Sequence, residues 1–453
     1  MSATAHVPAA NSAGTLVVRG DLRSQTGWSR ATRALVKLMQ PHFGCVFGID
    51  LHYSPVVSVL PAPFRLIGER DIDLLTEAHV KLTLLNMCLP HEFRFVPDAD
   101  NIGYFFWETD KPPAGAGWTE LAGLMDQIWV PTDWQRKIVM EWMRQVGRDT
   151  DVRVVPWPQE TPDIPAAPSD WAPRLAVHRV LGTAELEQLA MTEETCQARQ
   201  RVPRFGPWIV AGAQRRLRHR VLDGTACELN LGAPPGALAF AVQTDVPRKG
   251  LPVLISEWLQ FRRTFPDAIL LLKLSSIDVF KDRTALHIRL SRMVHRLSAS
   301  AGGPDDGIFV CYDRLTDATL AACYRAATAF VSASFGEGFG GPIVESLIAG
   351  TLPLMPAHTA CAGLLPEDYP FRVESRPVIG KLVDELPLYP PDGSWHVAVE
   401  GAIARRLCEL FSATPETRSG VLLTCQQHLR DAFGADVVAP RVASALSALE
   451  NAA

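Results

Sequence analysis

The chain has 453 residues, of which 47% are apolar and 21% are charged, with 44 Lys and Arg against 49 Asp and Glu. This length excludes a single small domain, because one hydrophobic core usually serves about 150 residues. The net charge is −5, and the sequence has no long run of like charges. These features exclude the extended positive electrostatic potential that a general nucleic-acid binder needs. We interpret the one basic stretch, Arg215–Arg220, as a solvated helix face and expect no nucleic acid as a partner.

The nine cysteines are odd in number and scattered, with no C-x-x-C pair and no Cys/His cluster at zinc spacing. We therefore expect reduced thiols and no metal site. The first 14 residues lack the basic and apolar regions of a secretory signal. The weakly polar stretch Leu347–Pro366 is interrupted by Gly350, Pro353 and Pro356, which argues against a transmembrane helix. These features predict a cytoplasmic protein without a transmembrane segment, and they leave peripheral contact with the inner face of a membrane open.

The first third of the chain alternates short apolar runs with segments of helical spacing. Runs of strand length occur at Thr15–Arg19, Cys45–Ile49, Val80–Met87, Ile102–Trp107, Gln127–Pro131 and Val152–Pro156. Between the first two, Trp28–Met39 places its apolar residues on one helix face. A strand–helix–strand order requires parallel pairing with right-handed crossovers. Residues 1–158 are thus predicted to form a doubly wound, Rossmann-like domain.

A proline-rich segment, with Pro156, Pro158, Pro162, Pro165 and Pro168, marks a boundary. We interpret 159–235 as a linker or helical insertion. The strand–helix rhythm resumes over 236–436, with strands at Leu238–Val242, Ala268–Leu274, Ile308–Tyr312, Ala329–Ser332 and Leu352–Met355 and helices at Leu251–Phe261 and Leu320–Ala326. Residues 437–453 are predicted as an amphipathic C-terminal helix. The fold class is α/β, with two doubly wound parallel-sheet domains whose strand ends face an interdomain cleft.

The segment Ser334–Thr351 carries the clearest chemical signal. Four glycines fall within the six residues 336–341, Pro342 suits the first turn of a helix, and Gly350 suits its end. Free N–H groups at such a helix start favour an anion, and Glu337 and Glu345 add acceptors for hydroxyl groups. A diphosphate joined to a polyol is the ligand that fits.

Embedded between a strand and a helix, this segment resembles the E-G-F-G-x-P-x-x-E frame of retaining glycosyltransferases of GT-B architecture, in the large family four. The matching residues are Glu337, Gly338, Phe339, Gly340, Pro342 and Glu345, and Asp317–Val331 looks like the family segment that precedes them. The resemblance implies transfer of a sugar from a nucleotide-sugar donor to an acceptor hydroxyl with retention of configuration. It implies that Glu345 binds the ribose, that Glu337 and the backbone of Phe339–Gly341 hold the sugar, and that no metal or cofactor is needed.

A basic pair follows the strand Leu238–Val242. Family members commonly place an Arg and a Lys here against the donor diphosphate, and Arg248 and Lys249 are the residues to which this role carries over. Thr244 stands where the commonest version of the motif has its Arg. Two cations can stabilise a departing diphosphate as a metal ion would. Lys273, at the end of the next apolar run, is a further candidate.

The first domain contributes two candidate segments by resemblance. Gly27, and more weakly Gly20, lie in a strand–loop–helix junction like the one that lines the family's donor site. The sequences Gly103–Asp110 and Asp126–Thr132 resemble a bacterial subgroup. Where many members have a histidine that contacts the transferred sugar, this chain has Trp107-Glu108, and Glu108 is our replacement candidate.

Two alternatives stay open. A metal-dependent glycosyltransferase would use a D-x-D pair, and Asp71-Ile72-Asp73 and Asp98-Ala99-Asp100 both have that pattern. A non-catalytic protein that binds sugar nucleotides or glycans would explain the missing Arg and histidine. For an active enzyme, the resemblance implies a glycan, lipid-linked or protein acceptor in bacterial glycan or polysaccharide assembly.

Overall fold

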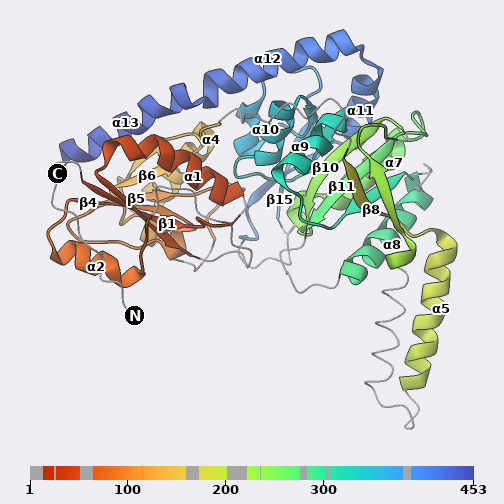
Figure 1. The fold of residues 1–453 in the computed structure, drawn as a ribbon, viewed down its shortest axis with the longest axis horizontal. Helices are drawn as coiled ribbons and strands as arrows, with labels where there is room; N and C mark the ends of the chain where they lie inside the picture. Colours follow the sequence, from red (N-terminus) through yellow and green to blue (C-terminus); the bar gives the residue numbers. More distant parts are fainter. Residues whose placement is uncertain are drawn as a thin grey trace.

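The computed structural model describes residues 14–24, 27–51, 65–113, 115, 117–159, 173–200, 222–234, 236–275, 283–301, 307–380 and 389–452, with the backbone alone for 192–200, 301 and 452. The stretch Arg215–Arg220, the prolines at 162, 165 and 168, and residues 1–13 lie outside these ranges. The described chain forms two α/β domains, shown side by side in Figure 1.

The first domain is built on a seven-stranded parallel sheet in the order β3-β2-β1-β4-β5-β6-β7. Its strands are β1 (Thr15–Gly20), β2 (Cys45–Asp50), β3 (Arg65–Leu66), β4 (Leu82–Met87), β5 (Asp100–Tyr104), β6 (Gln127–Val130) and β7 (Asp151–Val154). Its helices are α1 (Gly27–Met39), α2 (Glu69–Glu77), α3 (Trp118–Ala122) and α4 (Asp133–Gln145). The predicted strands and the helix Trp28–Met39 are confirmed, since apolar runs such as β1 and β4 are buried along their whole length.

The second domain has five parallel strands in the order β14-β13-β10-β11-β12. They are β10 (Leu238–Thr244), β11 (Ile269–Ser275), β12 (Ile308–Cys311), β13 (Ala329–Val331) and β14 (Leu352–Leu354). The helices around them are α7 (Leu251–Phe261), α8 (Arg283–Ala301), α9 (Asp317–Ala326), α10 (Gly341–Ala349) and α11 (Ala402–Ser412). Both sheets thus have the doubly wound order predicted, with β1 and β10 at the centre where the order reverses.

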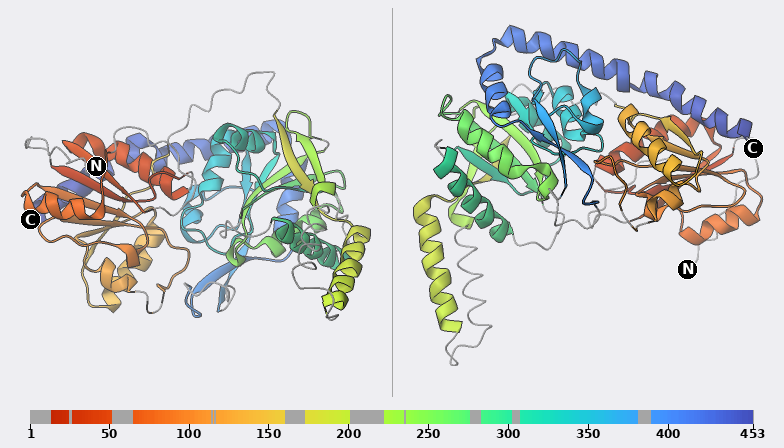
Figure 2. Two further views of the ribbon diagram at one scale, coloured as in Figure 1. Left: turned by 60° about the horizontal axis from the view of Figure 1, so that its bottom comes forward. Right: turned by 180° about the vertical axis from the view of Figure 1, so that it is seen from behind.

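Residues 159–235 differ from the predicted linker or helical insertion. Their described part supplies β8 (Arg174–Arg179) and β9 (Ala226–Asn230), which extend the second sheet because β8 pairs antiparallel with β12 and β9 pairs antiparallel with β8. Helix α5 (Thr183–Gln200) projects from this edge (Figure 2). The strands were missed because β9 is the edge strand and β8 lies next to it, and few residues of either strand are buried.

The last two helices cross from the second domain back to the first. Helix α12 (Pro415–Phe433) starts on the second domain and α13 (Ala435–Ala452) ends beside α1 (Figure 1). Val438, Val442 and Leu449 of α13 are buried in one core cluster with Leu35 and Met39 of α1. The amphipathic helix predicted at 437–453 is therefore present, and its apolar face completes the core of the first domain.

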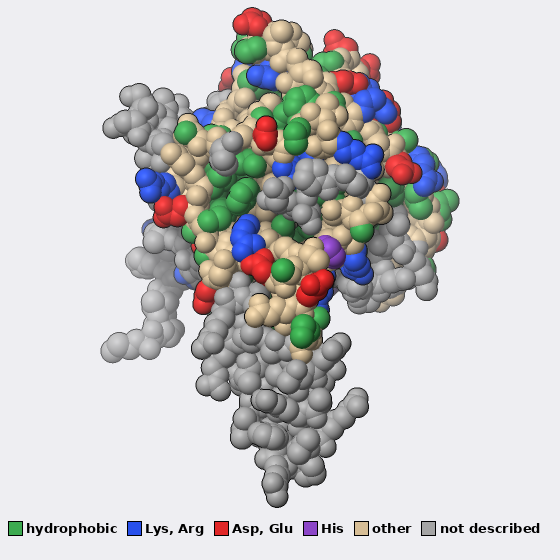
Figure 3. Space-filling view, turned by 90° about the vertical axis from the view of Figure 1, so that its right-hand side faces the viewer, with side chains coloured by type: hydrophobic (Ala, Val, Ile, Leu, Met, Phe, Trp, Pro, Cys, Tyr) green, Lys and Arg blue, Asp and Glu red, His purple; other side chains and the backbone are tan. Residues whose placement is uncertain are grey.

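A two-stranded antiparallel sheet, β15 (Ser375–Ile379) with β16 (Ser394–Ala398), has no counterpart among the predicted strands. It lies beside the segment that connects β13 to α10, and the His396 N–H donates to the Phe335 carbonyl of that segment at 2.9 Å. The end of the second domain in Figure 3 mixes acidic and basic side chains, which agrees with the balanced composition. Over the described residues, no helix is long and apolar enough to cross a bilayer.

Candidate active site between the domains

The glycine-rich segment Ser334–Gly341 joins β13 to α10, as the sequence predicts. Gly340 precedes α10 with φ 99°, a left-handed conformation that favours glycine, and Gly350 ends the helix with φ 96°. A Cβ at Gly338 would lie 2.8 Å from the Cβ of Phe106 in the first domain. The loop therefore contacts the partner domain closely only because position 338 lacks a side chain.

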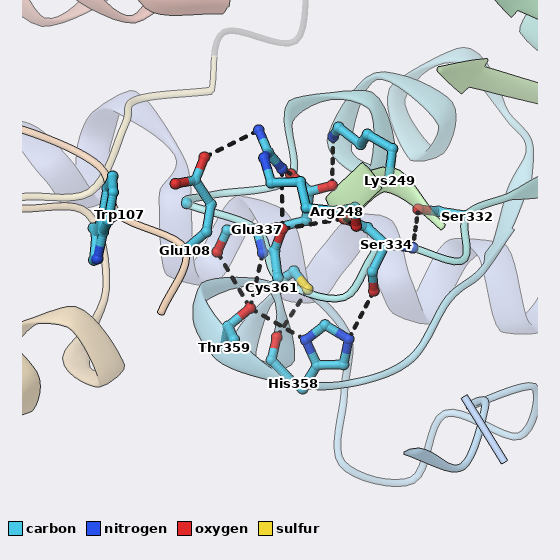
Figure 4. A network of polar contacts seen from close by, with 12 residues as sticks. Trp107, Glu108, Arg248, Lys249, Ser332, Ser334, Glu337, His358, Thr359 and Cys361 are labelled. Carbon is cyan, nitrogen blue, oxygen red and sulfur yellow. Dashed lines mark hydrogen bonds and ion pairs between the residues drawn. The ribbon is translucent and has the colours of Figure 1, made fainter. Parts of the chain in front are cut away.

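Glu337 and the predicted basic pair form one ion-pair group (Figure 4). Lys249 Nζ lies 2.5 Å from Glu337 Oε1, and Arg248 Nη1 lies 3.5 Å from Glu337 Oε2. Arg248 Nη2 lies 3.0 Å from Glu108 Oε1 of the first domain. The four side chains are only 11–18% exposed. The structure thus brings together all four residues predicted as catalytic, and Arg248 connects the two domains.

The charges in this group are fixed by one another. Burial alone would raise the pKa of Glu337, but Lys249 and Arg248 outweigh it and hold that pKa at about 2. Burial would lower the pKa of Arg248, but Glu108, Tyr389 and Glu337 outweigh it and raise the pKa. Glu337 is therefore a carboxylate and Arg248 a cation throughout the physiological range. This arrangement places two cations beside the glycine-rich loop, each paired with a carboxylate.

The first domain packs onto the loop through the segment that follows β5. Gln135 of α4 donates from Nε2 to the Trp107 carbonyl at 3.1 Å and to the Gly338 carbonyl at 2.8 Å. Tyr389 donates its hydroxyl to Glu108 Oε2 at 3.0 Å. Trp107 itself is buried and stacks on Tyr389 with ring centroids 4.9 Å apart. Glu108 therefore points at the second domain, whereas Trp107 is part of the core.

A second layer of side chains supports the backbone of Glu337. The Thr359 hydroxyl accepts from the Glu337 N–H at 3.1 Å, and Thr359 has φ 51°, which is unfavourable for a β-branched residue. His358 Nε2 lies 3.0 Å from the Ser334 carbonyl, so this nitrogen carries the proton. Burial, with a smaller contribution from His396, lowers the pKa of His358 to about 4. The ring therefore stays neutral while it holds the loop.

Glu345 lies on α10 and is engaged on both oxygens. Arg30 of α1 donates from Nη1 to Glu345 Oε1 at 2.6 Å, and Tyr324 of α9 donates its hydroxyl to Glu345 Oε2 at 3.0 Å. Burial raises the pKa of Glu345, and Arg30 and Tyr324 oppose this shift. Like Glu337, Glu345 lies where the two domains meet.

The starts of α1 and α10 meet at the indole of Trp157. A Cβ at Gly27 would lie 3.5 Å from this ring, and one at Gly341 would lie 3.7 Å from it. Trp157 also packs against Phe339 with ring centroids 5.1 Å apart. Two helix N-termini, each suited to an anion, therefore face one another across one aromatic side chain.

Lys273 and the D-x-D pairs lie elsewhere. Burial lowers the pKa of Lys273, and its ionisable neighbours are Cys311, Arg283, Asp313 and Arg314, none of which belongs to the Glu337 group. Asp71 accepts from the Gly68 N–H at 2.6 Å at the start of α2, and Asp100 accepts from Thr83 at 3.2 Å. Over the part of the chain that the structure describes, no group of three His, Cys, Asp or Glu could hold a metal ion.

A cavity of about 640 Å³ lies between α5 and α8, lined in part by Glu187, Arg289, Arg292 and Arg296. It contains none of the predicted site residues. The charged groups converge instead on the glycine-rich helix start at the domain interface.

Sequence reasoning missed the residues that complete the interface, namely Arg30, Gln135, Trp157, His358, Thr359 and Tyr389. Arg30 and Gln135 sit on amphipathic helices, where a polar residue ordinarily faces solvent. Tyr389 and His358 belong to segments without helical or strand periodicity. Only a tertiary contact distinguishes these residues from their neighbours.

Comparison with known proteins is informative for the fold alone. No family model matches the chain, and no curated protein is similar to it in sequence. Among solved structures, one from E. coli, described as trehalose-6-phosphate bound with UDP-2-fluoro glucose, matches with a TM-score of 0.58 at 11% identity, over 96% of this chain and 98% of that one.

Two further solved structures match over nearly their whole length. A UDP-forming α,α-trehalose-phosphate synthase from Burkholderia xenovorans in complex with glucose-6-phosphate has a TM-score of 0.56 at 11% identity, over 96% of this chain and 100% of that one. The N-terminal domain of a Candida albicans trehalose-6-phosphate phosphatase has a TM-score of 0.57 at 10% identity, over 96% and 97%. Two doubly wound domains in this arrangement, shared with trehalose-phosphate synthases, show that the chain has the GT-B fold.

Proposed function

We propose that the chain is a retaining glycosyltransferase of family four that moves a sugar from a nucleotide-sugar donor to an acceptor hydroxyl. One observation carries the proposal: Glu337, Arg248 and Lys249 converge within 3.5 Å on a glycine-rich loop at the start of α10, against the other domain. A helix start with two cations and two nearby carboxylates, Glu337 and Glu345, matches the chemistry of a sugar diphosphate.

Each residue has a distinct role in this mechanism. Lys249 and Arg248 neutralise the diphosphate as it departs, and Glu108 orients Arg248 from the first domain. Glu345 accepts hydrogen bonds from the ribose. Glu337 and the N–H groups of Phe339–Gly341 bind the hydroxyls of the sugar, and Gly27 allows the phosphates to approach α1. The leaving phosphate takes the acceptor proton, so no side-chain base, metal ion or cofactor is required.

The comparisons guide the choice of first substrates. One matching structure is described with UDP-2-fluoro glucose and another as UDP-forming with glucose-6-phosphate. UDP-glucose and glucose-6-phosphate are therefore the first pair to assay. Our wider proposal is a glycan, lipid-linked or protein acceptor, in bacterial glycan or polysaccharide assembly in the cytoplasm or at the inner face of the membrane.

A thermal-shift screen with UDP-, GDP-, ADP- and TDP-sugars tests the proposal. At least one donor should raise the melting temperature of the wild type, and Glu345→Ala should abolish that shift without lowering the melting temperature of the free protein by more than a few degrees. If no nucleotide sugar stabilises the protein, or if Glu345→Ala responds as the wild type does, the proposed site is wrong.

A non-catalytic binding protein is the second candidate, and two contacts favour it. Arg30 engages Glu345, and Trp157 lies between Gly27 and Gly341, so protein groups contact several positions meant for a donor. Slow release of nucleoside diphosphate from a donor in the absence of acceptor would exclude this candidate. Binding without turnover over a broad donor and acceptor panel would support it.

A further inference from the structure

Arg30 reaches from the first domain to the glutamate that we propose for the donor ribose. It lies on α1, and its Nη1 is 2.6 Å from Glu345 Oε1 on α10. Its Nη2 is 2.5 Å from Asp317 Oδ1 at the start of α9. A single guanidinium therefore ties the first domain to two helices of the second.

The two partners of Glu345 differ in where they come from. Tyr324 is buried and lies on α9, so its hydrogen bond to Glu345 stays within the second domain. Arg30 belongs to the first domain, and its bond depends on how the domains are placed. A small separation of the domains would free Glu345 Oε1 and leave Glu345 Oε2 bound to Tyr324.

The exposure of this ion pair suits a contact that opens and closes. The Arg30 and Glu345 side chains are 29% and 31% exposed, and Asp317 is 78% exposed. An ion pair with such access to water changes the equilibrium constant between closed and separated domains by only a few-fold. The interdomain pair Arg248–Glu108 is less exposed, at 18% and 16%. Arg30–Glu345 is thus the more exposed of these two ion pairs between the domains.

We propose that Arg30 is a latch that closes on Glu345 when no donor is bound and that the donor displaces it. The guanidinium and the ribose hydroxyls would approach the same carboxylate from the domain interface, so donor binding must shift Arg30. The exposed side chain of Asp317 pairs with the other terminal nitrogen of Arg30, Nη2. This inference rests on the proposed role of Glu345 as the ribose ligand.

The affinity for UDP, measured by calorimetry, tests the latch. Arg30→Met keeps an unbranched apolar side chain and removes its charge, so UDP should bind about threefold to fivefold more tightly than to the wild type. Asp317→Asn should have a smaller effect in the same direction. Arg325→Met, which removes an exposed charge from α9, is the matched control and should leave the affinity unchanged. Equal or weaker binding of UDP by Arg30→Met overturns the latch.

Interdomain distance gives a second readout that does not depend on nucleotide. With fluorophores on α2 and α8, energy transfer in the free protein should report a larger mean separation for Arg30→Met than for Arg325→Met, and an equal separation contradicts the latch. If the wild type and all variants fail to bind UDP, GDP and ADP, the proposed function is wrong, and so is the proposal that a donor displaces Arg30. If the wild type binds UDP and Arg30→Met binds it equally well, the latch alone is wrong.

Discussion

Replacing Lys249 separates its role in catalysis from its role in the fold. Lys249 Nζ lies 2.5 Å from Glu337 Oε1, and both side chains are under 15% exposed. Breaking a buried pair costs about 3–5 kcal/mol when the remaining charge has no other partner. Arg248, 3.5 Å from the same carboxylate, still compensates Glu337. We therefore expect Lys249→Ala to lower the free energy of unfolding by only about 1–2 kcal/mol.

The effect on transfer should be larger. Removing one group that stabilises developing charge in a water-poor site lowers kcat by about 10²–10³-fold, or about 3–4 kcal/mol. Urea unfolding and steady-state transfer from a nucleotide sugar measure the two effects on the same preparation. Lys249→Arg should recover part of the rate, and Lys137→Ala, on the exposed face of α4, is the control. A Lys249→Ala enzyme that is folded and within about threefold of the wild-type kcat would refute the role of Lys249 at the diphosphate.

Three other outcomes follow from the same geometry. Glu108→Gln should lower kcat by about tenfold, because Arg248 loses the carboxylate that orients it. Glu108→Asp, which keeps a carboxylate, should lower kcat less. Equal kcat values for the two variants would show that the carboxylate does not matter. Transfer should persist in excess chelator, and strict dependence on manganese would favour the D-x-D alternative. As the pH falls from 6.5 to about 4, His358 gains a proton in the unfolded state but not in the folded one, so stability should fall by up to about 3 kcal/mol from this residue. His358→Gln should flatten that part of the curve of unfolding free energy against pH, whereas an unchanged slope would assign it to other groups.

The pH dependence of the Glu337 group has the same sign but a lower range. Because the pKa of this carboxyl is held at about 2 in the folded state, its stabilising effect is complete above about pH 4.5 and is lost as the pH falls toward 2. Glu337→Gln should remove this component. Comparison of acid unfolding for the two proteins measures it, and identical curves would show that the ion pair makes no net contribution to stability.

The sequence predicts the parallel strands because they are buried on both faces and read as continuous apolar runs. Strand β11 is an example, with Ile269–Leu272 fully in the core. The loop and helix around Glu337 and Glu345 are also predictable from the sequence. Gly340, Pro342 and Gly350 lie at positions where the local backbone geometry favours glycine or proline. These features depend on short-range rules.

The missed features depend on long-range packing. Strand β9 is mostly exposed and β8 buries only Leu175 and Val177, so neither has a continuous apolar run. Arg30 and Glu345 are 315 positions apart, and nothing in either local sequence specifies the pair. The prediction for Glu108 came from resemblance, and its contact with Arg248 became visible only when both domains were placed together.

The most direct test of the central claim is the anomeric configuration of the product, measured by proton NMR with UDP-glucose as donor and glucose-6-phosphate as the first acceptor. We expect release of UDP and a product whose transferred sugar keeps the α configuration of the donor, and Lys249→Ala should lose both signals. An inverted product, or UDP release that Lys249→Ala leaves unchanged, would contradict a retaining transfer at the Arg248–Lys249–Glu337 group.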